Sequence, residues 1–316
     1  MKKFALLIFS TVILLTPSML PAADYPVKPI RIISPFAAGD AIDNTARVIA
    51  ERLKSILKTP VVVQNIPGGG GAVGLAEAAK ADADGYTMVI ASTGALTAGP
   101  LVNKGGFDPD DFAPLARLVT IPLALAVGEK SPCNTLRDIV TAAKTRELSY
   151  STPGASSKQR IVMTRFAKEN GMKLVHVAGK SGTDAATKAM TGEVDFVFTG
   201  LPVFENLARS GKLKVIAVSA EKRADYMPDV PTFREGGYSA PGELWFGLLL
   251  RKEVPAHIRD ILDKAVKKAV SQEETKQLYA KLRFSDGYLD RDAFAKVIAG
   301  NIAEHRIVLK ELGLIK

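Results

Sequence analysis

The chain has 316 residues, a single cysteine and a formal net charge of +9 at pH 7. This length allows one large or two medium domains, and one cysteine cannot form an internal disulfide, so packing must stabilise the fold. The basic residues are scattered and nearly matched by acidic ones, without an arginine-rich tract or interleaved aromatic residues, which argues against nucleic-acid binding.

The first 23 residues have the features of an export signal. A basic start at Lys2 and Lys3 is followed by an apolar run over residues 4–15. Small residues at Ala22 and Ala23 then supply a cleavage site. The apolar run is shorter than the roughly 20 residues of a membrane span, although an uncleaved anchor is the alternative. We therefore predict a signal peptide over residues 1–23 and a periplasmic location for the mature chain.

From residue 30 onward, short β-rich runs alternate with amphipathic helical stretches. Apolar residues recur at helical spacing from residue 41, for example at Ile42, Ala46 and Ile49. The first block is predicted to contain strands over residues 30–34, 61–64 and 86–91 and helices over residues 41–57 and 73–80.

A second block repeats this alternation. It is predicted to contain strands over residues 123–127, 148–151, 174–177, 194–198 and 215–218, with helices that include residues 135–146 and 157–169. After a returning strand at 245–250, the chain is predicted to be helical to its end. Alternating strands and helices indicate parallel sheets covered by helices on both faces. We predict one lobe from residues 24–122 and 245–316 and a second lobe from residues 123–244.

Loops rich in small and polar residues follow four of the predicted strands, at residues 35–40, 92–94, 151–157 and 178–182. Ligands bind beyond the carboxyl ends of strands in open parallel sheets, and free backbone N–H groups at a helix start attract anions. The alternative is that these residues only cap the following helices, which is open for Asp40 and Asp43. Four such loops at matching positions favour a ligand cleft.

Two nucleotide-binding motifs are excluded. Gly69, Gly71 and Gly74 have the spacing of a dinucleotide-binding fingerprint, but they follow the second strand, and no acidic residue ends the next strand. Residues 179–181 resemble the end of a phosphate-binding P-loop, but Leu174 occupies the position of the leading glycine.

Catalytic and metal sites are not predicted either. His176, His257 and His305 are far apart in the sequence and lack metal-ligand spacing. Cys133 has no identifiable base partner, and no G-x-S-x-G elbow is present. We predict no enzyme activity, no cofactor and no metal.

Short motifs in a constant order along the mature chain are similar to one known family. They include Tyr25-Pro26-Val27-Lys28-Pro29-Ile30-Arg31, Pro35-Phe36, Asn65-Ile66-Pro67-Gly68, Asp84-Gly85-Tyr86-Thr87, Asp108-Pro109, Gly192-Glu193-Val194-Asp195 and Trp245-Phe246-Gly247-Leu248. Each motif is weak alone, but the set is specific. The chain resembles the receptors of tripartite tricarboxylate transporters, the Bug family of periplasmic solute receptors.

The resemblance implies an α/β, type II periplasmic-binding-protein fold, in which two Rossmann-like lobes enclose a ligand cleft. In this family, loops of both lobes hold a ligand carboxylate, partly through ordered waters. By position, the candidate ligand-binding residues of the first lobe are Phe36, Ala37, Ala38, Gly39, Asp43, Ser92, Thr93 and Gly94. Those of the second lobe are Ser151, Pro153, Gly154, Ser156, Ala178, Gly179 and Thr199, joined by Trp245.

The chain departs from the family pattern within these loops. Residues 37–40 read Ala-Ala-Gly-Asp where the family usually has Pro-Pro-Gly-Gly, and the added Asp40 carboxylate would disfavour an adjacent anion. Lys158 and Arg160 stand in a segment that often reads Ser-Pro-His, and Thr199 replaces a common aspartate. We expect a ligand with one carboxylate and a separate polar or cationic group. The alternative is that Asp40 caps a helix and faces away from the cleft.

The predicted function is that of a monomeric receptor, which closes over a small organic carboxylate and delivers it to the membrane permease subunits of a tripartite transporter. The first alternative is a sensory receptor that docks on a sensor kinase. An exported enzyme on a similar fold is the second, and the missing nucleophile–base pair argues against it.

Overall fold

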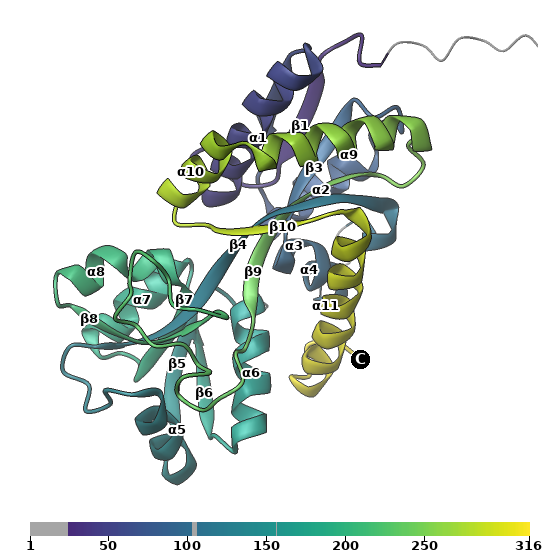
Figure 1. Cartoon of the computed structure of the whole chain (residues 1–316). Helices are drawn as coiled ribbons and strands as arrows, with labels where there is room; N and C mark the ends of the chain where they lie inside the picture. The colour runs from purple at the N-terminus through teal and green to yellow at the C-terminus, as the bar shows by residue number, and fades with distance from the viewer. Residues whose placement is uncertain (1–24, 103–105, 156) are drawn as a thin grey trace, which may run out of the picture.

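The computed structural model describes residues 25–102, 106–155 and 157–316. It has two α/β lobes joined by two long strands (Figure 1). The strand order is β2-β1-β3-β9-β4-β7-β5-β6, and β8 and β10 pair with β4 outside this path. The predicted signal peptide lies outside the described residues.

The first lobe is built on three parallel strands. β1 (Ile30–Ser34) lies between β2 (Val61–Asn65) and β3 (Thr87–Ser92). The helices of this lobe are α1 (Ala41–Leu57), α2 (Ala72–Ala79), α3 (Thr93–Thr97), α4 (Gly99–Val102), α9 (Ala256–Ser271), α10 (Glu273–Lys281) and α11 (Arg291–Glu311). The apolar face of α1 packs with α9 on one side of the sheet, since apolar residues at helical spacing form a continuous stripe.

The second lobe repeats the parallel arrangement. β5 (Leu148–Thr152) lies between β6 (Leu174–Ala178) and β7 (Phe196–Gly200). Its other elements are α5 (Leu136–Thr145), α6 (Lys158–Asn170), α7 (Gly182–Thr191), α8 (Glu205–Arg209) and β8 (Leu213–Ser219). One buried cluster unites β5 and β7 with α5 and α6, and another unites β7 and β8 with α7.

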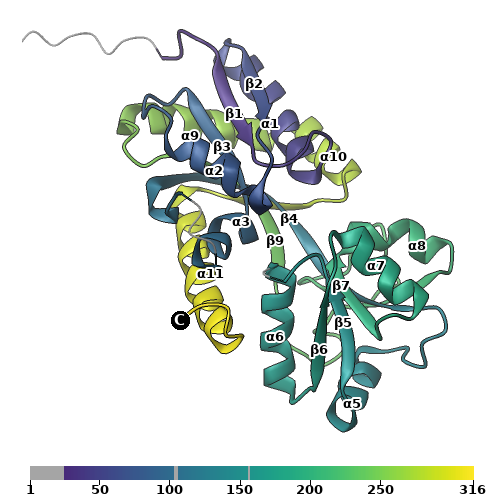
Figure 2. The ribbon, with the colours of Figure 1, turned by 180° about the vertical axis from the view of Figure 1, so that it is seen from behind.

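Two strands carry the chain between the lobes. β4 (Phe112–Gly128) pairs antiparallel with β9 (Glu243–Arg251) as far as Pro122, and with β7 and β8 from Leu123 onward. One strand therefore contributes to the sheets of both lobes (Figure 2). The exact division of the chain into moving lobes stays a prediction.

Two details of the predicted topology are wrong. Besides the parallel pairs, β9 pairs antiparallel with β3 and β4, and β4 pairs antiparallel with β7 and β8. The C-terminal segment is not wholly helical, because β10 (Ser285–Leu289) lies between α10 and α11 and pairs with β4. This strand has few apolar residues, and it forms through pairing with a distant segment. Within β4, Pro114 and a register shift obscured the first half of the strand.

A close contact at Gly247 gives a stability prediction. A Cβ built on Gly247 of β9 would overlap the Phe294 ring and lie 2.9 Å from the Ala116 carbonyl oxygen. We expect Gly247→Ala to lower the free energy of unfolding by about 1–3 kcal/mol, because overpacking a tight core forces strain. Urea denaturation will measure the change. Gly300→Ala on α11, where the added methyl meets nothing within 4 Å, should be neutral or slightly stabilising; equal losses for both variants would contradict this prediction.

Candidate functional site

The carboxyl ends of the parallel strands in both lobes lead into the predicted ligand loops. Three of these loops precede α1, α6 and α7, but the loop predicted at residues 92–94 is wrong, because Ser92 ends β3 and α3 begins directly at Thr93. A Cβ placed on Gly94, in α3, lies 3.8 Å from the backbone nitrogen of Lys158, the first residue of α6. Figure 2 shows α3 and α6 on facing sides of the two lobes. The start of α3 and the start of α6 therefore meet across the lobes.

The buried carboxylate of Asp43 anchors the loop before α1. Its carboxylate accepts hydrogen bonds from Gly39 N (2.8 Å), Arg47 Nε (2.9 Å) and Asn65 Nδ2 (2.7 Å). Burial raises the pKa of Asp43, but these hydrogen bonds outweigh it and hold the pKa below its ordinary value. The side chain is fully buried, so the geometry makes Asp43 a positioning residue of the loop rather than a ligand contact.

The exposed part of this loop consists of Ala37, Ala38, Gly39 and Asp40, with Phe36 partly buried behind it. Asp40 is the N-cap of α1, and its carboxylate accepts a hydrogen bond from Ile42 N at 3.2 Å. Asp40 therefore caps α1, as the alternative interpretation of the sequence proposed, although the residue remains exposed.

The start of α3 is tied to β9, the second crossing strand. The buried Thr93 hydroxyl accepts a hydrogen bond from Trp245 N at 2.9 Å, and Ser92 and Gly94 beside it are partly exposed. Trp245 is only 3% exposed, and its Nε1 donates to Asn301 Oδ1 at 2.9 Å. Trp245 therefore connects β9 to α3 and α11 inside the first lobe, and its ring offers little surface to a ligand.

In the second lobe, the loop before α6 contains a network of small polar groups. Thr152 Oγ1 lies 2.9 Å from His176 Nε2 and 3.0 Å from Ser157 Oγ. Ser157 Oγ donates to the Gly154 carbonyl oxygen at 2.8 Å and accepts from the backbone N–H of Arg160, which caps α6. The predicted contact Ser156 lies outside the described residues.

Thr199 and Pro153, which were also predicted to bind ligand, lie near Gly182, the first residue of α7. A Cβ there would lie 3.0 Å from Thr199 Oγ1 and 3.9 Å from Pro153 Cγ. Gly179 is buried and donates its N–H to the Thr152 carbonyl oxygen. In addition, Ala178 is exposed, and Ser151 is fully buried with a hydroxyl that has no partner among the described residues.

Sequence reasoning left Gly182, Ser157 and His176 out of the candidate site. The signal for Gly182 and Ser157 was present, since both adjoin a predicted helix start. His176 was considered, but only its neighbours across the sheet place it in this network. Burial and the nearby Arg160 lower its pKa to about 4, so at neutral pH the imidazole brings no positive charge.

The two cations beside the second-lobe loop, Lys158 and Arg160, are both engaged within the protein. Lys158 is buried and pairs with Glu304 of α11 at 2.8 Å, while Arg160 Nη1 donates to the Ala155 carbonyl oxygen at 2.7 Å. Burial lowers the pKa of Lys158, and the adjacent carboxylate opposes that effect. A ligand anion would thus be met mainly by backbone N–H groups and hydroxyls.

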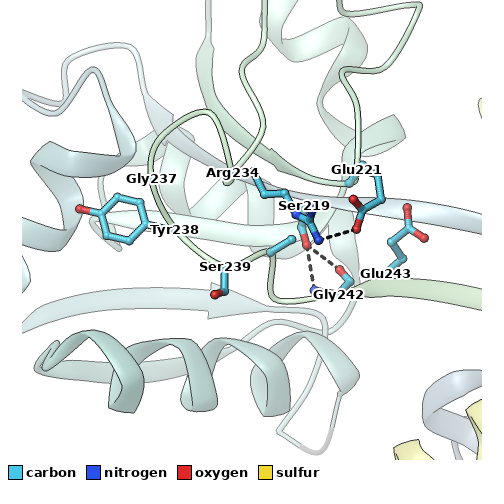
Figure 3. A pocket seen from close by; sticks show the side chains of 10 residues that line it. Ser219, Glu221, Arg234, Gly237, Tyr238, Ser239, Gly242 and Glu243 are labelled. Carbon is cyan, nitrogen blue, oxygen red and sulfur yellow. Dashed lines mark hydrogen bonds and ion pairs between the residues drawn. The ribbon is translucent and has the colours of Figure 1, made fainter.

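Two cavities of the structure lie elsewhere in the second lobe. One of about 570 Å³ is beside the start of β9 and includes Ser219, Arg234 and Glu243 in its lining (Figure 3). Another of about 560 Å³ includes Ser149 and Asp195. Neither cavity is lined by a residue predicted to bind ligand. Across the described ranges there is no cluster of three potential metal ligands, and no helix there has the length and hydrophobicity to span a membrane.

Comparison with known proteins decides the family. The model of the tripartite tricarboxylate transporter family receptor matches residues 45–314. The chain belongs to this receptor family. The protein is 34% identical over 266 residues to a UPF0065 protein of Bordetella bronchiseptica, and the match covers 80% of this chain and 78% of the relative.

Solved structures agree with this assignment. A TctC solute-binding protein from Polaromonas is 26% identical, with a TM-score of 0.80 over 91% of this chain and all of the other. R. palustris Rpa4515 with adipate is 25% identical, with a TM-score of 0.77 over 92% of this chain and 99% of the other. The predicted family and two-lobed fold are confirmed. Members of this tripartite tricarboxylate transporter receptor family are periplasmic solute-binding proteins rather than enzymes.

Proposed function

We propose that this receptor holds a small organic carboxylate between its lobes and delivers it to the membrane subunits of a tripartite transporter. The observation that carries the proposal is the meeting of Gly94, at the start of α3, with the start of α6. Small residues there let ligand oxygens approach the backbone closely, and a helix start offers unpaired N–H groups. Rpa4515, a relative, has a structure with adipate.

The charges around the loops favour a ligand with one carboxylate and a separate polar or cationic group. Lys158 is balanced by Glu304, and Asp40 adds a negative charge at the exposed loop. A second or third ligand carboxylate would therefore lack a counter-charge, and like charges at close range repel.

In the proposed mechanism, the lobes open transiently to admit the ligand and then close around it. Closure is favoured because ligand oxygens gain hydrogen bonds from both lobes only in the closed form. Hydrogen bonds to a charged group contribute about 1.5–3 kcal/mol each, and micromolar binding corresponds to about −8 kcal/mol. A few such bonds are enough after the ordering costs of binding.

A thermal-shift series will test the ligand class. At 100 times its Kd, a ligand adds about 2.7 kcal/mol of stability, which corresponds to a rise in Tm of roughly 5 °C. We expect monocarboxylates to raise Tm and the matching amides to leave it unchanged. Equal shifts by acids and amides would contradict carboxylate recognition.

Asp40→Gly should improve binding of di- and tricarboxylates, because it removes a negative charge from the exposed loop. If the ligand preference of this variant were unchanged, the proposal of a single ligand carboxylate would be wrong.

Delivery to a transporter is proposed over docking on a sensor kinase. Copurification of the closed receptor with permease subunits would support transport, whereas copurification with a kinase ectodomain would support sensing.

We further propose a monomer with two moving bodies. One body consists of residues 24–122 and 245–316, and the other of residues 123–244. Light scattering after gel filtration will test the monomer, and hydrogen exchange with and without ligand will test the division.

A further inference from the structure

The lobes are joined by ion pairs beside the crossing strands, first between α6 and α11. Glu304 of α11 accepts from Lys158 Nζ at 2.8 Å and from Arg165 Nη1 at 2.6 Å. Two turns further along α11, Glu311 Oε1 lies 2.6 Å from Lys168 Nζ. All three cations belong to the second lobe and both carboxylates to the first.

This contact is largely buried at its centre. The Lys158 side chain is 4% exposed and that of Glu304 is 17% exposed. Ile161 of α6 is buried against Val308 and Leu309 of α11 in one apolar cluster. Separating the helices would hydrate the ion pair and expose this cluster, while removing one partner in the closed form would leave a buried charge uncompensated.

A second ion pair joins the lobes on the other flank. Arg283, just before β10, donates from Nε and Nη2 to the two carboxylate oxygens of Glu205 on α8, each at 2.8 Å. The guanidinium also lies 5.0 Å from the centroid of the Tyr226 ring. A bidentate pair of this kind fixes orientation as well as distance. In Figures 1 and 2, α6 and α11 lie on one side of β4 and β9, and α8 and α10 lie on the other.

We infer that Glu304 and Glu205 form a two-sided latch that holds the lobes closed before any ligand binds. Lys158, which meets Glu304, is also the residue whose backbone nitrogen faces Gly94. Opening the ligand loops at this point therefore requires the Lys158–Glu304 contact to separate. The latch rests on the two-lobed receptor fold and not on the identity of the ligand.

Distance measurements on the ligand-free protein will test the latch. Val62 of β2 is 51% exposed and Val175 of β6 is 44% exposed, and they lie on the strands at opposite ends of the sheet order. Spin labels on Val62→Cys and Val175→Cys, with the buried Cys133 left in place, will report lobe separation by pulsed electron paramagnetic resonance.

Three charge-neutralising variants will be compared with the unmodified receptor. We expect the ligand-free, unmodified receptor to give a single distance between the two labels, which is the distance of the closed form. Glu304→Gln should reduce the ratio of closed to open molecules by roughly tenfold or more, and Glu205→Gln should reduce it less. Glu274→Gln is the matched control, because Glu274 pairs with Arg52 inside the first lobe at 3.1 Å, and it should leave the distance unchanged.

A folded Glu304→Gln protein with the distance of the unmodified receptor would overturn the latch, as would a ligand-free receptor that is already open. If Glu304→Gln does not fold, the test passes to Glu205→Gln, and no lengthening of the distance in that variant would also overturn the latch. Failure of every carboxylate in the thermal-shift series would leave these distances unaffected, so the two proposals fail separately.

Discussion

Replacing Asp43 with alanine is expected to lower the free energy of unfolding by about 3 kcal/mol. The carboxylate is fully buried and accepts from Gly39, Arg47 and Asn65, so its removal breaks three hydrogen bonds at once. A hydrogen bond to a charged group contributes about 1.5–3 kcal/mol, and solvent can partly replace the acceptor for the exposed donors Gly39 and Arg47. Urea denaturation of the ligand-free protein at neutral pH will measure the loss.

The second lobe supplies a matched control at Asp184. Its carboxylate accepts from Lys180 N at 2.9 Å, as Asp43 accepts from the N–H four residues before it, but the surroundings are more open. Asp184→Ala should therefore cost much less than Asp43→Ala. If the two variants lost the same stability, burial of Asp43 would not be the cause. Ligand affinity should also fall in Asp43→Ala, because the loop over residues 36–40 loses its anchor.

The free energy of unfolding is expected to decrease as the pH falls from about 6.5 to about 4. Burial lowers the pKa of His305 to about 3 and that of His176 to about 4, whereas an unfolded histidine titrates near 6.5. Below pH 6.5 the unfolded chain binds more protons at these sites, so their stabilising effect is present above that pH and is lost on acidification. Each histidine contributes a slope of at most about 1.4 kcal/mol per pH unit.

One carboxylate, that of Asp263, has the opposite effect on the free energy of unfolding as the pH falls. Burial raises the pKa of Asp263 to about 6, despite the nearby Arg291. Its folded form takes up a proton before the unfolded form does, so acidification between about pH 6 and 4 stabilises the fold at this site. Asp263 therefore offsets about one histidine, and the expected net slope is about 1.4 kcal/mol per pH unit.

His305→Asn will separate this titration from packing. His305 Nδ1 lies 2.9 Å from Thr97 Oγ1, and Thr97 Oγ1 also donates to the Thr93 carbonyl oxygen at 2.6 Å. With its hydrogen committed there, Thr97 accepts from Nδ1–H, which an asparagine amide can imitate. We expect the variant to have a flatter pH profile by urea denaturation. A profile parallel to that of the unmodified protein would show that His305 does not titrate in this window.

Elements with strong local patterns were predictable from the sequence. The strand at residues 30–34 and the helix at 41–57 have the same bounds in the structure, because apolar spacing and the Asp40 cap are local signals. β10 was missed, since a short polar strand acquires its structure only by pairing with β4. Tertiary pairing of this kind overrides local preference.

The sequence could predict where small residues and helix starts follow the strands, but not the ion pairs around them. The loops at the strand ends could be identified from their small residues and helix starts. The sequence placed the Lys158 cation near the second-lobe loop, but its partner Glu304 lies 146 residues away. No local pattern indicates such a pair. The same applies to Trp245, whose partners on α11 bury the ring in the first lobe.

The continuous strand β4 also constrains how the molecule can move. Its ladder to β9 extends to Pro122, and its ladders to β7 and β8 begin at Leu123. Sliding one half of the protein past the other would break these hydrogen bonds, whereas bending or twisting at this junction preserves them. The path of motion is therefore set by the backbone, so substitutions in the surrounding loops can change which solute is accepted without redesigning the movement that captures it.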